Sequence, residues 1–275
     1  MSVDEHTIEL AGSPVFYRRA PRPGSAGREP LYLHGIPTSS DDWTAFLERT
    51  GGVAPDLIGF GRSGKGGHLD YSLDGYAQFI EQFLDYLRID RVEVVAHQWG
   101  AAAAMVFAQR NRHRIGRLVL IDPVPLTVDF TWPPALARLR RPLLGELVMG
   151  SVPKRSFAKL LRTGGRFSDE RVDELWEQFD QGTQRAILRI VRGTDDHVLT
   201  TAGADLAQVD IPALILGGEL DPWLPADTAD SYAKRLPNAT PARIAGARHW
   251  PWHDDPTVVA RVITFLQQTD RHPQP

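Results

Sequence analysis

Residue 98 lies where a reactive side chain is expected, and it is a glutamine. The segment around it runs Val-Val-Ala-His-Gln-Trp-Gly-Ala over residues 94–101, a β-branched run followed by a tight turn and small residues. This strand–turn–helix context is typical of a nucleophile elbow, which thrusts one side chain over the top of a sheet. We expect serine, aspartate or cysteine there, because a neutral amide is not among the usual protein nucleophiles. The chain looks built for covalent catalysis but lacks the reacting atom.

The elements that position this turn alternate along the chain. We predict strands at residues 6–10, 14–19, 31–33, 53–57, 92–96, 117–121, 213–216 and 242–245, the first two forming a hairpin followed by a loop at 20–30. We predict helices at residues 43–49, 73–87 (with Ser72 as the cap), 100–110, 226–235 and 256–268. Strands that alternate with helices indicate an α/β fold with a mostly parallel twisted sheet flanked by helices on both faces. Ligands bind such sheets at the carboxyl ends of the strands.

Residues from about 126 to 209 interrupt this alternation. They are rich in Arg, Leu, Trp and Phe, with helical spacing at 173–179 and 183–191. We predict a helical cap at residues 126–209, inserted into a core made of residues 1–125 and 210–275. Caps of this kind usually roof a pocket and exclude water. The cap aromatics that we consider as a group for pocket contacts are Trp132, Phe157, Phe167, Trp176 and Phe179.

Composition limits the function classes. A chain of 275 residues fits one large domain or one domain with an insertion. The net charge of −3 gives no electrostatic case for nucleic acid, and the lack of cysteine excludes disulfides and thiolate chemistry. No signal peptide is visible, and the longest apolar stretch, residues 101–108, is too short to span a membrane. We therefore expect a cytoplasmic protein with a small-molecule substrate and no cofactor, nucleic-acid or membrane partner; a homodimer is possible.

Several motifs follow one another in a characteristic order. His-Gly-Ile-Pro at residues 34–37 precedes Asp-Leu-Ile-Gly-Phe-Gly-Arg-Ser at 56–63, then come the elbow, an acidic residue and a late histidine. This order resembles the α/β-hydrolase fold family along nearly the whole chain. The His-Gln-Trp-Gly turn is most similar to the His-Asp-Trp-Gly elbow of the epoxide hydrolase and haloalkane dehalogenase branch. Gln98 stands where that branch has its nucleophilic aspartate.

The resemblance implies roles for other residues. His249 matches the catalytic histidine, and Asp221 matches the acid that orients it. Asp122 also ends a strand and is the alternative acid. The backbone N–H groups of Ile36 and Trp99 would form the oxyanion hole. Trp250, beside the histidine, is a further candidate for substrate contact.

The chain also departs from this branch in two ways. The asparagine that dehalogenases commonly pair with the elbow tryptophan is absent, because the loop runs His-Gly-Ile over residues 34–36. Residues 126–209 contain no tyrosine to protonate an epoxide oxygen. Both departures argue against the standard reactions of the branch.

An amide cannot form an ester intermediate, but it can donate and accept hydrogen bonds. Our leading hypothesis is a non-covalent enzyme acting on a small apolar or aromatic metabolite by water addition, ring opening or closure, or elimination. His249 and Asp221 would supply general acid–base catalysis, and Gln98 would position the substrate or water. The alternatives are a ligand-binding module that has lost catalysis, a cofactor-free oxygenase, and an ordinary epoxide hydrolase or dehalogenase whose nucleophile was replaced by engineering.

Two further patterns have simpler explanations. Residues 59–65 fit the spacing of a phosphate-binding loop, but Gly66 replaces the required Ser or Thr and no helix is expected to begin there. Residues 195–197, Asp-Asp-His, suggest a metal site, but adjacent residues rarely converge on one ion, and a helix cap explains them better.

Overall fold

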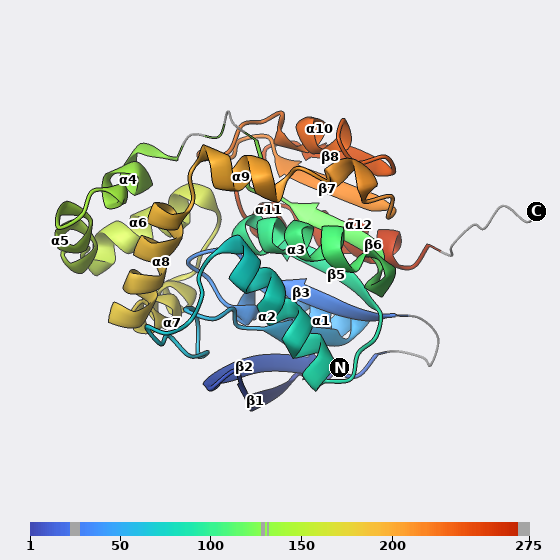
Figure 1. Ribbon diagram of the computed structural model, residues 1–275, viewed down its shortest axis with the longest axis horizontal. Helices are drawn as coiled ribbons and strands as arrows, with labels where there is room; N and C mark the ends of the chain where they lie inside the picture. Colours follow the sequence, from blue (N-terminus) through green and yellow to red (C-terminus); the bar gives the residue numbers. More distant parts are fainter. Residues whose placement is uncertain (23–27, 128–129, 131, 269–275) are drawn as a thin grey trace, which may run out of the picture.

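The computed structural model describes residues 1–22, 28–127, 130 and 132–268. Eight strands form one sheet in the order β1-β2-β4-β3-β5-β6-β7-β8 (Figure 1). Their bounds are β1 Asp4–Leu10, β2 Ser13–Ala20, β3 Glu29–Leu33, β4 Gly52–Pro55, β5 Val92–His97, β6 Ile115–Ile121, β7 Ala213–Gly218 and β8 Ala239–Ile244. The pairs β1–β2 and β2–β4 are antiparallel, and the other neighbours are parallel. The predicted α/β class and mostly parallel sheet are confirmed.

Helices cover both faces of this sheet. On one face α2 (Leu73–Tyr86) packs against α3 (Gln98–Asn111), and on the other α1 (Thr44–Thr50) lies beside α12 (Thr257–Leu266) (Figure 1). The short helix α10 (Thr228–Ala233) packs on β7 and β8. Strands β5 and β6 are buried along their whole length because helices lie on both sides of them. None of the helices in the described ranges has the length and apolar character needed to cross a membrane.

The described residues between β6 and β7 form helices and no strand of the sheet. These are α4 (Pro134–Ala137), α5 (Leu144–Gly150), α6 (Lys154–Gly164), α7 (Asp169–Gln178), α8 (Gln181–Gly193) and α9 (Asp196–Ala202), with 3₁₀ turns at Arg138–Arg140 and Leu206–Gln208. We call them the β6–β7 helices. Most of them gather at one end of the sheet (Figure 1). That this segment forms a cap of its own remains a prediction.

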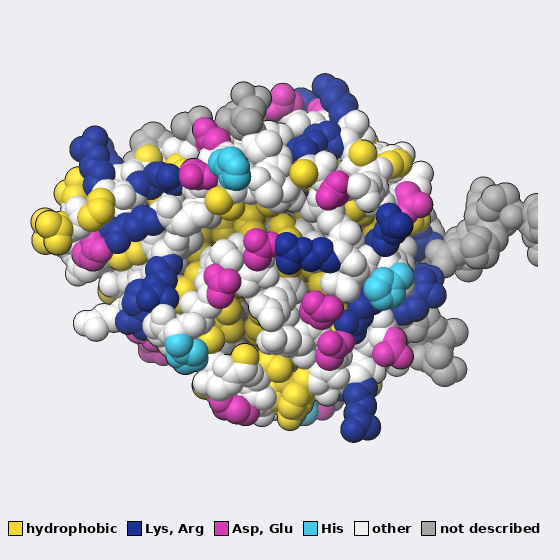
Figure 2. All heavy atoms as spheres, viewed as in Figure 1, with side chains coloured by type: hydrophobic (Ala, Val, Ile, Leu, Met, Phe, Trp, Pro, Cys, Tyr) yellow, Lys and Arg dark blue, Asp and Glu magenta, His cyan; other side chains and the backbone are white. Residues whose placement is uncertain are grey.

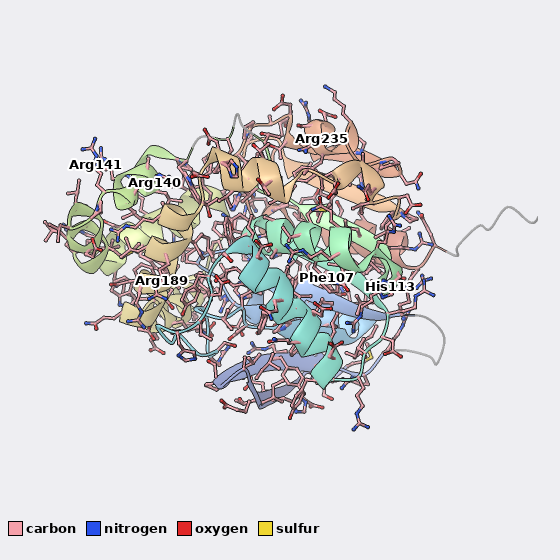
Figure 3. All side chains as sticks on the ribbon, in the orientation of Figure 1. Phe107, His113, Arg140, Arg141, Arg189 and Arg235 are labelled. Atoms are coloured by element: carbon pink, nitrogen blue, oxygen red, sulfur yellow. The ribbon has the colours of Figure 1, made fainter. Side chains whose placement is uncertain are left out.

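Arginines tie the β6–β7 helices to the rest of the molecule. Arg189 on α8 donates to the Gly67 carbonyl oxygen at 2.6 Å. Arg235, just after α10, donates to the carbonyl oxygens of both Leu126 and Gly203, and Figure 3 labels both arginines. Leu126 lies before these helices in the chain and Gly203 just after α9, so one guanidinium holds both ends of the segment.

Several predicted boundaries differ from the structure. The strand expected at residues 53–57 ends at Pro55, because Asp56 begins a loop held by its own carboxylate. The helix expected at 226–235 is shorter, and α11 (Pro251–Asp254) was not expected. Ser72 caps α2 as predicted, accepting the Gly75 N–H at 3.0 Å. The predicted loop at 20–30 lies partly outside the described residues, which omit 23–27.

Candidate active site

Gln98 lies at the turn from β5 into α3, in a backbone conformation that few side chains adopt. Its φ angle is +47°, in the left-handed region. Two glycines let the turn pack closely. A Cβ on Gly100 would lie 2.4 Å from the His34 carbonyl oxygen, and one on Gly35 would lie 2.8 Å from Cβ of Gln98. The strand, the helix and these close approaches hold the Gln98 side chain at the carboxyl edge of the sheet.

The amide oxygen of Gln98 occupies the point where two backbone N–H groups meet. Ile36 donates to Gln98 Oε1 at 3.0 Å, and Trp99 donates at 2.7 Å. The sequence led us to expect these N–H groups free for substrate, and the structure instead places the glutamine's own oxygen against them. Two donors need an acceptor, so the amide orientation is fixed and Nε2 is directed away from them. Nε2 makes no hydrogen bond within the described residues.

His249 and Asp221 form a hydrogen-bonded pair at the same edge. His249 Nδ1 lies 2.7 Å from Asp221 Oδ2, and both side chains are only 2% exposed. Asp221 Oδ1 accepts the N–H groups of Trp223 at 2.8 Å and Leu224 at 3.1 Å. Burial raises the pKa of Asp221, but His249 and these N–H groups outweigh burial and hold the pKa below its ordinary value. The ionised carboxylate therefore fixes the proton of His249 on Nδ1 and leaves Nε2 as the basic nitrogen.

An apolar cavity of about 340 Å³ adjoins both groups. Gln98 and His249 line it at the sheet, and almost all its other lining residues are apolar, among them Ile36, Val124, Trp132, Phe157, Leu160 and Trp250. The described residues between β6 and β7, in the helices and in the segments that connect them, supply most of this apolar wall. Of the aromatics considered from the sequence, Trp132, Phe157 and Phe179 line the cavity. Phe167 instead packs behind Trp250, and Trp176 behind Phe157.

Comparison with known proteins agrees with this architecture. The family model for the alpha/beta hydrolase fold matches residues 31–256, most of the chain. The chain belongs to the α/β hydrolase fold family.

Named relatives of this α/β hydrolase include dehalogenases. It is 30% identical over 280 residues to a haloalkane dehalogenase of Mesorhizobium japonicum, covering 93% of this chain and 88% of that protein. It is also 30% identical over 271 residues to an uncharacterized protein of Mycobacterium tuberculosis, covering 92% and 78%. The crystal structure of haloalkane dehalogenase DbeA from Bradyrhizobium elkani superposes with a TM-score of 0.80 at 25% identity, covering 95% of this chain and 96% of that one.

Two buried histidines support the site of this α/β hydrolase and were missed from the sequence. His34 donates from Nδ1 to the Gly35 carbonyl oxygen at 2.7 Å and accepts the Leu57 N–H at Nε2 at 2.8 Å. These bonds hold the loop that carries the Ile36 N–H. His97 donates from Nε2 to the carbonyl oxygen of His249 at 2.9 Å. Burial lowers the pKa of both, so both are neutral at neutral pH. In the sequence, the only indication of these supporting roles was that His34 and His97 lie close to residues 36 and 98.

Asp122 ends β6 as predicted but does not hold the histidine. Its Oδ1 accepts the Gly218 N–H at 2.9 Å. Burial, together with the negative charge of Asp221, raises the pKa of Asp122 well above its ordinary value. The raised pKa favours the neutral, protonated form of this carboxyl beside the ionised Asp221. Its other oxygen, Oδ2, has no hydrogen-bond partner within the described residues. The partner of His249 in the structure is Asp221.

The tryptophans predicted for substrate contact occupy different places. Trp250 lines the cavity, and its ring packs edge-on to His249 with centroids 4.8 Å apart. Trp99 is fully buried between Tyr76 and Trp132, and its ring is not among the cavity walls. The indole N–H groups of both have no partner within the described ranges.

The two patterns set aside from the sequence have structural explanations. Asp195 caps α9, accepting the Val198 N–H at 2.9 Å. No helix begins after residue 65 until α2 at Leu73. Within the part of the chain that the structure describes, no group of three or more His, Asp or Glu side chains is arranged to hold a metal ion.

Proposed function

We propose that this α/β hydrolase is a non-covalent acid–base enzyme for a small apolar or aromatic compound. The observation that carries the proposal is the seating of Gln98 Oε1 on two backbone N–H groups. This leaves Nε2 as the polar group of the side chain that can serve the cavity, which Gln98 and His249 both line. The site then has one hydrogen-bond donor and one base at the floor of an apolar pocket. Water addition, ring opening or closure, and elimination all need this pair.

His249 is the proposed base and acid. Its Nε2 takes a proton from a substrate C–H or from water and returns it later, while Asp221 stabilises the imidazolium. A positioned acid–base group of this kind contributes about 10²–10⁴-fold in rate. This role needs no covalent intermediate and no cofactor.

Gln98 is the proposed substrate-positioning donor. The two N–H groups that bond to its oxygen polarise the amide and strengthen the N–H groups on Nε2 as donors. These would hold a carbonyl, ether or hydroxyl oxygen of the substrate. Because glutamine is uncharged, it tolerates an enolate that an aspartate would repel. We therefore assign the stabilisation of developing charge to this side chain and not directly to the backbone of Ile36 and Trp99.

The cavity supports the substrate class. Its volume of about 340 Å³ suits a compound the size of a single aromatic ring with short substituents. The apolar wall gives affinity for hydrocarbon surface, and the few polar groups at the floor fix orientation. The names of the haloalkane dehalogenases among the relatives also indicate small apolar substrates. An ester intermediate at position 98 would need a carboxylate, however, and this chain encodes a glutamine there.

Proton exchange in D₂O tests the proposal directly. The probes are acetophenone, phenylacetone and benzoylacetone, aryl ketones with one or two carbonyl acceptors and C–H groups of graded acidity. We expect the wild-type protein to accelerate exchange of at least one probe, followed by NMR. His249→Ala should reduce that acceleration by about 10²–10⁴-fold.

The matched control is a substitution that removes a histidine outside the cavity. His113 is exposed in the turn after α3 and does not line the cavity, so His113→Ala should leave exchange unchanged (Figure 3). Equal exchange by wild type and His249→Ala contradicts the proposal. Binding without exchange would instead support a ligand-binding module, and oxygen uptake with the ketones would support the cofactor-free oxygenase; either result overturns it.

A further inference from the structure

The protein holds the carbonyl oxygen of the Gln98 amide in the way that an acyl-transfer enzyme holds the carbonyl oxygen of its substrate. The Gln98 oxygen accepts two backbone N–H groups, from Ile36 at 3.0 Å and Trp99 at 2.7 Å. A pair of N–H groups at this distance stabilises the negative oxygen of a tetrahedral intermediate. Here the carbonyl in that position belongs to the protein itself.

The groups needed to complete such a reaction line the same cavity. His249 is paired with Asp221 at 2.7 Å, as a general base requires. The cavity of about 340 Å³ is large enough for water, which needs polar partners to stay ordered. The free sides of His249 and the Gln98 amide supply such partners.

We propose that Gln98 is a self-modification site, at which the protein hydrolyses its own side-chain amide to a glutamate and releases ammonia. The inference shares the base of the proposed function, but it needs no external substrate. The nucleophile is water, and no oxidant, reductant or cofactor takes part.

The bonds and protons balance as follows. Water attacks Cδ of Gln98 while His249 Nε2 takes one of its protons, and the carbonyl π electrons move to Oε1. The N–H groups of Ile36 and Trp99 hold the resulting oxyanion. When the intermediate collapses, the Cδ–Nε2 bond breaks and the imidazolium of His249 gives its proton to the leaving nitrogen. The products are ammonia and a carboxylic acid, which ionises.

The conversion would change the chemistry of the site. A glutamate in place of Gln98 has two oxygens, so the N–H groups of Ile36 and Trp99 would hold one and the other would face the cavity. The donor on Nε2 would be lost and a carboxylate gained at the elbow. Self-hydrolysis would thus convert an acid–base site into one with a nucleophilic oxygen.

Mass spectrometry of the purified protein tests this inference. The protein is incubated at neutral pH in H₂¹⁸O without any substrate and then digested with trypsin. Residues 92–110 lie between arginines and form one peptide that contains both Gln98 and Gln109. We expect Gln98 to gain the mass of a glutamate carrying one heavy oxygen, with Gln109 unchanged. Gln109 is a matched internal control, because its amide bonds to the backbone of Met105, Ala202 and Asp205 and it does not line the cavity.

Variants show whether the site itself does the chemistry. His249→Ala and Asp221→Asn should each slow the conversion, the first by about 10²-fold or more, whereas His113→Ala should not. Circular dichroism establishes that each variant is folded, and Gln98→Glu provides the mass standard.

Persistence of the unmodified amide in the wild type over days overturns the inference, as does conversion at an equal rate in His249→Ala. Neither result touches the proposed function, which rests on proton exchange with ketones. Failure of ketone exchange would likewise leave this mass measurement valid.

Discussion

Asp122 lies beside the Asp221–His249 pair, and its protonation state affects the charge balance of that pair. Burial and the Asp221 charge raise its pKa well above the ordinary value, which favours the protonated, neutral carboxyl. A neutral carboxyl beside Asp221 lets that carboxylate stay ionised for His249. Two ionised carboxylates at this depth would repel each other and weaken the pair.

Asp122→Asn should therefore stabilise the protein at neutral pH. A group with a raised native pKa binds its proton more tightly when folded, so its contribution to stability falls as pH rises from about 3.9 through the native pKa. Asparagine has no proton to lose. We expect a gain in unfolding free energy of at least about 1 kcal/mol at pH 7, and a smaller difference at pH 3, measured by urea denaturation. A loss of stability at pH 7 would contradict this electrostatic explanation.

The sequence predicted which residues gather at this site but not how they are oriented. Gln98, Asp221 and His249 follow strands whose carboxyl ends share one edge, so their proximity follows from the fold. The rotation of the Gln98 amide depends on the Ile36 N–H, which comes from a loop 62 residues away. The support from His34 and His97 likewise depends on backbone groups brought close only by tertiary packing. No local pattern encodes such contacts.

At the scale of elements, a cluster of charges joins α7 to the N-terminal part of the sheet. Asp41 contacts Arg18 of β2 at 2.5 Å, Arg62 at 3.3 Å and Arg171 of α7 at 2.8 Å. Its side chain is 13% exposed. Burial raises the pKa of Asp41, but the three guanidinium groups outweigh burial and hold the pKa well below its ordinary value.

Asp41→Asn should loosen this junction. Hydrogen bonds to charged groups contribute about 1.5–3 kcal/mol, and we expect a loss of that size in unfolding free energy at pH 7. A depressed native pKa adds stability above the unfolded value near 3.9, and this stability is lost as pH falls below it. The difference between wild type and variant should therefore narrow at pH 3. Urea denaturation at both pH values measures it, and an unchanged difference would contradict the electrostatic explanation.

At the scale of the whole molecule, the cavity lies between the sheet edge and the β6–β7 helices, so a bound compound should stabilise both together. Acetophenone at a concentration of 100 times its dissociation constant should add about 2.7 kcal/mol to the unfolding free energy. The matched variant is Leu160→Arg, which places a charge in the cavity wall. Differential scanning fluorimetry should show a rise in melting temperature for the wild type and none for Leu160→Arg. Equal shifts in both would place the binding elsewhere.

The molecule also exposes apolar side chains at α5, far from the sheet. Leu143 is 85% exposed and Leu147 is 70% exposed, and Figure 2 shows hydrophobic atoms gathered at that end. The homodimer considered from the sequence stays a prediction.

The two hydrogen bonds of Arg235 bear on how the cavity wall can change in evolution. Because one guanidinium binds the carbonyl oxygens of Leu126 and Gly203, the chain between them is a loop whose ends are already joined. The entropy of closing a loop rises slowly with its length, by about 0.6 kcal/mol for each doubling. We therefore expect that the β6–β7 helices can be lengthened, shortened or exchanged together while the sheet, Gln98 and His249 stay in place, so that the cavity wall can change without rebuilding the fold.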